Sequence, residues 1–197
     1  MSDLFDRFWP ALHAREGGDR FTDLAADRGG PTRHGVTAAK LGEWRKLGRP
    51  ATAAEVRALG ESEAKAIYRQ DFFVAPGFAR VAEVSPRIAE ELLDTGVNMG
   101  TRWPALWLQQ VLNATNRQGL DWADIREDGA PGPVTVRALQ ALLQRRGVRA
   151  GEDLVLTCLN GLQFGRYWEI VRRGGPDNDQ EQNFVGWIQQ RIGGLAA

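Results

Sequence analysis

The residues best suited to chemistry lie near the N-terminus. Glu16 is followed by Gly17 and Gly18, and the loop beyond carries Asp27 and Thr32. A helical apolar pattern ends at the glycine pair, which places Glu16 at the C-terminal end of a helix. The negative end of the helix dipole and partial burial would both raise the pKa of a carboxyl group there. A protonated acid of this kind is suited to general acid catalysis on a glycosidic bond.

The following loop offers the groups that such an acid would need as partners. Asp27 supplies a carboxylate and Thr32 a hydroxyl, and together they could hold a water on the opposite face of a sugar. The alternative is purely structural, because a glutamate before Gly-Gly is often a helix end and a glycine-rich loop with an aspartate is often a turn. On residue types alone, the structural interpretation is the more common one.

Composition excludes several classes of protein. The 197 residues carry 25 Lys and Arg against 25 Asp and Glu, so the net charge is zero and no nucleic-acid partner is expected. No apolar run approaches the roughly 18 residues of a membrane span. The first residues lack a basic segment followed by an apolar one, so we expect a chain made in the cytoplasm without a signal peptide.

Metal and cofactor chemistry is not expected. His13 and Glu16 are three residues apart on the predicted helix and His34 follows later, but no zinc-binding spacing is present. Cys158 lies in an apolar stretch, where a buried core thiol is far more common than a nucleophile.

The elements that must position these residues are predicted to be mainly α-helical, with a loop or short β-hairpin over residues 19–37. Thr52 and Glu55 have the form of a capping box, and Ser85 before Pro86 is typical of a helix start. Further helices are expected after Thr37 and Pro104, and at residues 61–73, 134–146, 152–173 and 182–192. The tryptophans expected in the helical core are Trp9, Trp44, Trp103, Trp107 and Trp168, whereas Trp122 and Trp187 could lie in the core or bind sugars.

Several motifs in order resemble glycoside hydrolase family 108. Glu16-Gly-Gly followed by Asp27-Arg-Gly-Gly-Pro-Thr-Arg-His-Gly-Val-Thr37 is similar to the family's Glu-Gly-Gly and Asp-Pro-Gly-Gly-x-Thr-x-Tyr-Gly-Ile-Thr. Residues 63–73 and 93–100 resemble its later motifs. The resemblance implies a lysozyme-like N-acetylmuramidase that cleaves the β-1,4 bond between N-acetylmuramic acid and N-acetylglucosamine.

The rest of the chain resembles the predicted peptidoglycan-binding domain that accompanies this catalytic module. The similarity lies in residues 128–139, 159–160 and 184–191. We therefore predict a hydrolase module over residues 1–97 and a helical peptidoglycan-binding module over residues 98–197.

The resemblance also assigns roles to residues. Glu16 is the implied catalytic acid, and Asp27 and Thr32 are its implied partners, although the loop before Asp27 is longer than the usual family spacing. His34 stands where the family has tyrosine. The positions expected to bind substrate are Gly17, Gly18, His34, Thr37, Tyr68 and Asn98, with no metal and no cofactor.

The implied partner is peptidoglycan, and the implied role is that of a phage or phage-derived endolysin in cell lysis. Such a protein would act in the periplasm or cell wall after passing a holin-like pore or an export machinery. Two alternatives remain open: a lytic transglycosylase, which forms 1,6-anhydro ends, and a non-catalytic wall-binding or export factor.

Overall fold

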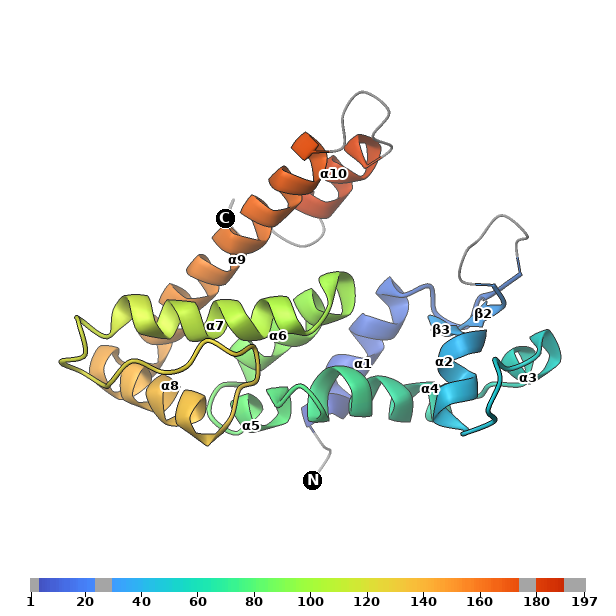
Figure 1. Ribbon diagram of the computed structural model, residues 1–197, viewed down its shortest axis with the longest axis horizontal. Helices are drawn as coiled ribbons and strands as arrows, with labels where there is room; N and C mark the ends of the chain where they lie inside the picture. Colours follow the sequence, from blue (N-terminus) through green and yellow to red (C-terminus); the bar gives the residue numbers. More distant parts are fainter. Residues whose placement is uncertain (1–3, 24–29, 174–179, 190–197) are drawn as a thin grey trace. The chain divides into compact units, whose positions relative to one another are not determined.

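The structure confirms a mainly α-helical protein with a small sheet (Figure 1). It is a computed structural model that describes residues 4–23, 30–173 and 180–189. The chain forms two compact units, Met1–Ala75 and Pro76–Ala197. Each unit is described by itself below. The predicted module boundary between residues 97 and 98 stays a prediction.

The first unit holds the predicted hairpin region between its helices. Its elements are α1 (Leu4–Arg15), β1 (Phe21–Thr22), β2 (Thr32–Arg33), β3 (Val36–Thr37), α2 (Ala38–Trp44), α3 (Ala53–Arg57), α4 (Glu61–Tyr68) and a π-helix, η1 (Arg69–Val74). The strands pair antiparallel in the order β1-β2-β3, with Thr32 opposite Thr37 and Arg33 opposite Val36. The sequence predicted one helix over residues 61–73, and the structure divides this stretch into α4 and η1.

One face of α1 supplies the core of this unit. Phe5, Phe8, Trp9 and Leu12 recur at helical spacing and are all buried. The ring of Phe73 in η1 lies 5.5 Å from that of Phe5 and 6.1 Å from that of Phe8, centroid to centroid. Because such aromatic pairs each contribute about 1 kcal/mol beyond burial, they fix the axis of α1 against η1.

Local hydrogen bonds start the helices where the sequence predicts. The capping box is confirmed: Thr52 Oγ1 accepts from the Glu55 backbone N–H at 3.3 Å, and the Glu55 carboxylate accepts from the Thr52 N–H at 2.6 Å. Arg49 pairs with the same carboxylate, and with Thr52 it lowers the pKa of Glu55 to about 2.

The second unit is helical throughout its described part. Its elements are α5 (Phe78–Ala82), α6 (Pro86–Met99), α7 (Arg102–Thr115), α8 (Pro133–Arg146), α9 (Val148–Arg173) and α10 (Glu181–Trp187). α9 packs against α6, α7 and α8, and α10 lies along the C-terminal half of α9 (Figure 1).

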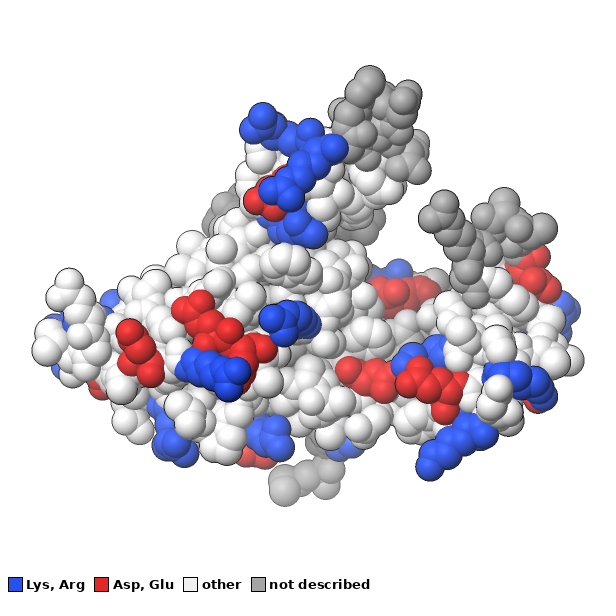
Figure 2. Space-filling model, viewed as in Figure 1, with Lys and Arg blue, Asp and Glu red and all other residues white. Residues whose placement is uncertain are grey.

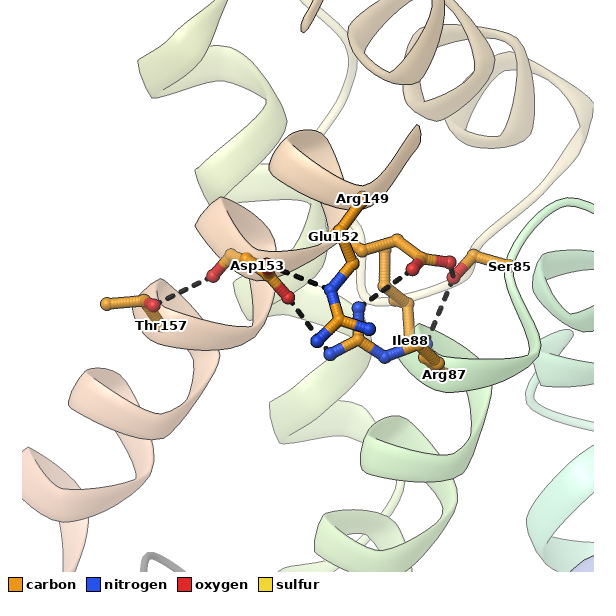
Figure 3. Close-up of polar contacts among 7 residues, drawn as sticks. All are labelled: Ser85, Arg87, Ile88, Arg149, Glu152, Asp153 and Thr157. Carbon is orange, nitrogen blue, oxygen red and sulfur yellow. Dashed lines mark hydrogen bonds and ion pairs between the residues drawn. The ribbon is translucent and has the colours of Figure 1, made fainter. Parts of the chain in front are cut away.

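A polar network joins the starts of α6 and α9 (Figure 3). Ser85, the predicted N-cap of α6, accepts from the Ile88 N–H and donates to the Glu152 carboxylate at 2.7 Å. Arg87 pairs with Glu152 at 2.8 Å and with Asp153 at 2.9 Å. The Glu152 side chain is 8% exposed, so its two hydrogen bonds satisfy a carboxylate that would otherwise be costly to bury.

Burial corrects part of the predicted core. Trp9 and Trp107 are buried as predicted, but Trp44 and Trp103 are 37% exposed and Trp168 is 48% exposed. Cys158 is only half-buried, and it lines an apolar cavity of about 370 Å³ between α7 and α9. Helical spacing identified the apolar face of each helix without revealing whether another element covers it.

Charged side chains of both signs lie on the surface of the described residues. Acidic and basic side chains lie beside one another within each unit on the face drawn in Figure 2. No helix in the described part of the chain is long and apolar enough to cross a membrane.

Candidate active site

Glu16 lies at the end of α1, as predicted. Its backbone N–H still donates to the Leu12 carbonyl at 3.0 Å, in the helical pattern. Gly17 and Gly18 then take φ values of +93° and +60°, and the Gly18 N–H donates back to the His13 carbonyl at 2.9 Å. These glycines adopt the left-handed conformation that ends a helix, so the predicted stop is confirmed.

The space beside the glycine pair is open. A Cβ added to Gly17 or Gly18 would have no heavy atom of the described residues within 4 Å. Glu16 itself is half-buried. A polymer could therefore approach the backbone next to this carboxyl group without meeting a side chain from the glycine pair.

The hairpin of β2 and β3 turns at His34 and Gly35. Both residues have positive φ, +52° and +72°, which is the geometry of a two-residue type I′ turn. Histidine tolerates the left-handed region better than most side chains, and glycine adopts it freely. The turn is compact and its histidine is 3% exposed.

The backbone of this turn lies directly against Glu16 and Tyr68. A Cβ added to Gly35 would come within 3.0 Å of Tyr68 Oη and within 3.3 Å of Glu16 Cβ. Tyr68, on α4, is 5% exposed. Burial, and to a lesser extent the charge of Glu16, raises the pKa of the Tyr68 hydroxyl, which therefore keeps its proton as a hydrogen-bond donor beside Glu16.

Aromatic and imidazole rings on the same face of α1 as Glu16 pack beside this site. Trp9 stacks on His13 with 4.9 Å between ring centroids and meets the edge of Tyr68 at 5.6 Å. Trp9 Nε1 donates to the Glu61 carboxylate at 2.8 Å. His13 Nε2 and His34 Nδ1 are 2.9 Å apart and share a hydrogen bond.

The structure thus brings together some of the predicted residues. Glu16, Tyr68 and the His34–Gly35 turn form one cluster, with Gly17 and Gly18 at its open side. The histidines, considered above as metal candidates, bond to each other. Among the described residues, no three His, Cys, Asp or Glu side chains gather in a group that could hold a metal ion.

Three further residues that were predicted to act in catalysis or substrate binding have hydrogen-bond partners outside this cluster. Thr32 Oγ1 donates to the Gly30 carbonyl at 3.0 Å. Thr37 caps α2 by accepting from the Lys40 N–H at 3.3 Å. Asn98 is exposed on α6 of the second unit, where its side-chain oxygen accepts from the Tyr167 hydroxyl at 2.9 Å. Their predicted roles in catalysis and substrate binding stay predictions, as does that of Asp27, which lies outside the described residues.

Sequence reasoning missed the tight placement of Gly35 and the supporting roles of Trp9 and Glu61. The sequence did contain a signal for the turn at Gly35. This glycine stands between Thr32-Arg33 and Val36-Thr37, and a glycine between two short β-prone segments is typical of a hairpin turn. The bond between Trp9 and Glu61 joins residues 52 positions apart and had no local signal.

Comparisons with known proteins place this arrangement in a family. Residues 10–100 match the family model for glycosyl hydrolase 108, and residues 103–192 match the model for a predicted peptidoglycan domain. The fold is similar to that of SagA from Brucella abortus, with a TM-score of 0.65 and 22% sequence identity over 98% of this chain and 94% of that one. No curated protein matches the sequence. Residues 10–100 therefore belong to glycosyl hydrolase family 108, and the chain is a glycoside hydrolase that acts on peptidoglycan.

Proposed function

We propose that this hydrolase is an N-acetylmuramidase that cleaves the β-1,4 bond between N-acetylmuramic acid and N-acetylglucosamine. One observation carries the proposal: Glu16 ends α1 beside an open glycine pair and against Tyr68 and the hairpin turn, within the region that matches the hydrolase family. A carboxyl group so placed can reach a glycosidic oxygen on a polymer.

In the proposed reaction, Glu16 donates a proton to the oxygen that leaves as the bond breaks. Asp27 and Thr32 then orient the attacking water or stabilise the positive charge on the sugar ring. The Tyr68 hydroxyl, which keeps its proton, positions the Glu16 carboxyl group. No metal or cofactor enters this scheme.

Replacement of Glu16 by glutamine tests the proposal. The variant keeps the size of the side chain but cannot donate an acidic proton, so release of soluble fragments from purified peptidoglycan should fall by about 100- to 10,000-fold, with unchanged thermal unfolding. Glu43→Gln is the matched control, because Glu43 is a 73% exposed side chain on α2. Near-normal fragment release by Glu16→Gln would refute the assignment.

Product analysis separates hydrolysis from its closest alternative. Mass spectrometry should find reducing N-acetylmuramic acid ends, which require water as the attacking group. Products with 1,6-anhydro ends would instead identify a lytic transglycosylase, in which the sugar's own 6-hydroxyl attacks. Binding to insoluble peptidoglycan without any soluble product would indicate a non-catalytic wall-binding factor.

The biological setting belongs to the same proposal. We infer a role in cell lysis or release, of the endolysin type, with action in the periplasm or cell wall and access through a holin-like pore or an export machinery. Expression of the chain with and without a pore-forming partner, followed by measurement of culture turbidity, tests this role. Lysis in both cultures, or in neither, would contradict it.

A further inference from the structure

Two histidines connect the catalytic helix to the hairpin. His13 lies on α1 and His34 in the β2–β3 turn, and their Nε2 and Nδ1 atoms are 2.9 Å apart. His34 is 3% exposed, and the half-buried His13 ring stacks on Trp9. The chain has two histidines in total, so this bridge uses both of them.

The hydrogen bond between the two rings can form only in certain protonation states. A hydrogen bond between two imidazoles needs a donor N–H on one ring and a lone pair on the other. The pair satisfies this requirement when both rings are neutral or when one carries an extra proton. When both rings are protonated, each ring nitrogen is a donor, so the bridge must break and two positive charges face each other.

Charged groups on two neighbouring elements face the pair. Arg33 on β2 opposes a positive charge on His34, as does His13. The pKa of the Glu61 carboxyl group on α4 is lowered mainly by its hydrogen bond from Trp9 and, to a lesser extent, by the charges of both histidines. Burial, followed by His13 and Arg33, lowers the pKa of His34 below its ordinary 6.5. A single extra proton therefore has a stabilising carboxylate nearby, but a second proton on the pair is disfavoured by the charge of the first.

The location of the bridge links it to the proposed acid. His13 precedes Glu16 by nearly one helical turn. His34 precedes Gly35, whose backbone lies against Glu16 Cβ and the Tyr68 hydroxyl. A bond between His13 and His34 therefore fixes the hairpin turn to the part of α1 that presents Glu16.

We propose that the His13–His34 hydrogen bond is a proton-sensitive latch that seats the hairpin turn against Glu16 and opens when both rings are protonated. His13 and His34 are positioning residues in this scheme and do not touch the reacting atoms. The effect on catalysis rests on the proposed function of Glu16, whereas the latch itself is a property of the fold.

Nuclear magnetic resonance tests the latch without any activity measurement. Untagged protein labelled with ¹⁵N in histidine gives ring signals from these two residues alone. We expect a bridged pair at pH 7.5, a His34 titration midpoint below 6.5, and faster hydrogen exchange of the Val36 amide below that midpoint. Independent titration of the two rings with unchanged exchange at Val36 would refute the latch.

Activity across pH 5 to 8 tests the positioning role. His34→Tyr keeps a ring and a hydrogen-bonding hydroxyl, and His13→Gln keeps an amide N–H donor. Neither new side chain titrates between pH 5 and 8. The natural chain should lose at least tenfold in kcat/KM between pH 7.5 and 5, while both variants change less than threefold. His34→Ala, which has no bridge, should be about tenfold lower than the natural chain at pH 7.5.

The outcomes distinguish the two proposals. An acid loss in both variants equal to that of the natural chain would refute the positioning role, since another group would then cause it. If Glu16→Gln remains active, the proposed function fails, but the ring titration and the Val36 exchange still decide whether the latch exists. Thermal unfolding at pH 7.5 establishes that each variant is folded, and the two non-titrating variants provide independent tests.

Discussion

Gly35→Ala is the substitution that most directly tests the geometry of the site. The new methyl group would overlap the Tyr68 hydroxyl, a contact closer than real Cβ atoms make, and would lie 3.3 Å from Glu16 Cβ, which is tighter than most such contacts. Tyr68 is buried and cannot move away freely, so the turn must move instead. The substitution therefore displaces the hairpin from Glu16.

The cost has two separable parts. An alanine at φ +72° costs about 1 kcal/mol, because its Cβ crowds the following carbonyl. Forcing a methyl group into the filled space adds about 1–3 kcal/mol. Together these terms predict a loss of about 2–4 kcal/mol in the free energy of unfolding. A displacement approaching 1 Å could lower kcat/KM by up to about 100-fold.

Gly48→Ala is the matched control for the backbone term. Gly48 has φ +68°, and a Cβ there would meet none of the described atoms within 4 Å. Its expected loss is about 1 kcal/mol, with kcat/KM unchanged. Denaturant unfolding measures the first quantity, and initial rates of fragment release from peptidoglycan measure the second.

The steric cause is tested by removing the group with which the methyl clashes. In a Tyr68→Phe background the hydroxyl is gone, so Gly35→Ala should cost at least about 1 kcal/mol less than it does in the natural chain. Two results would refute the reasoning: equal losses for Gly35→Ala and Gly48→Ala, or an identical cost of Gly35→Ala in both backgrounds.

Two further predictions concern the second unit. Glu152→Gln should lower the free energy of unfolding by about 1–2 kcal/mol, which is less than for a fully buried pair because the Arg87 side chain is 39% exposed. The control Asp153→Asn, in which the lost carboxylate is exposed, should leave the free energy of unfolding nearly unchanged. Equal effects in denaturant unfolding would contradict the role given to the buried carboxylate. The fragment 98–197 should melt more than about 10 °C below the fragment 76–197, because it lacks nearly all of α6, which packs against α7 and α9, and all of α5, which packs against α8. Calorimetry compares the two, and equal melting temperatures would contradict the prediction.

Local signals accounted for the parts of the fold that the sequence predicted well. The Thr52–Glu55 capping box and the Ser85 cap depend on residues three positions apart, so the sequence contains all that they require. The same holds for the glycine pair after Glu16, where the left-handed conformation follows from the residue type.

The features that the sequence did not predict depend on packing between segments that are distant in the chain. The exposure of Trp168 depends on which element covers one side of α9, and helical spacing carries no information on that. The π-helix after Tyr68 could not be predicted from the sequence either, because the residues of η1 continue the apolar helical pattern of α4. The Trp9–Glu61 and His13–His34 contacts each join segments that are far apart in the chain.

The motif at residues 93–100 resembles the hydrolase family but lies in the second compact unit. The hydrolase family model extends to residue 100, but residues 76–100 belong to the second compact unit, where α6 packs against α5, α7 and α9. The part of the hydrolase region that contains α6 is therefore folded around helices of the predicted peptidoglycan domain. Asn98 illustrates the consequence, because its side chain bonds to Tyr167 of α9, within that domain. The packing of α6 against α9 therefore joins residues of both family regions within one compact unit, even though their sequence motifs are separate.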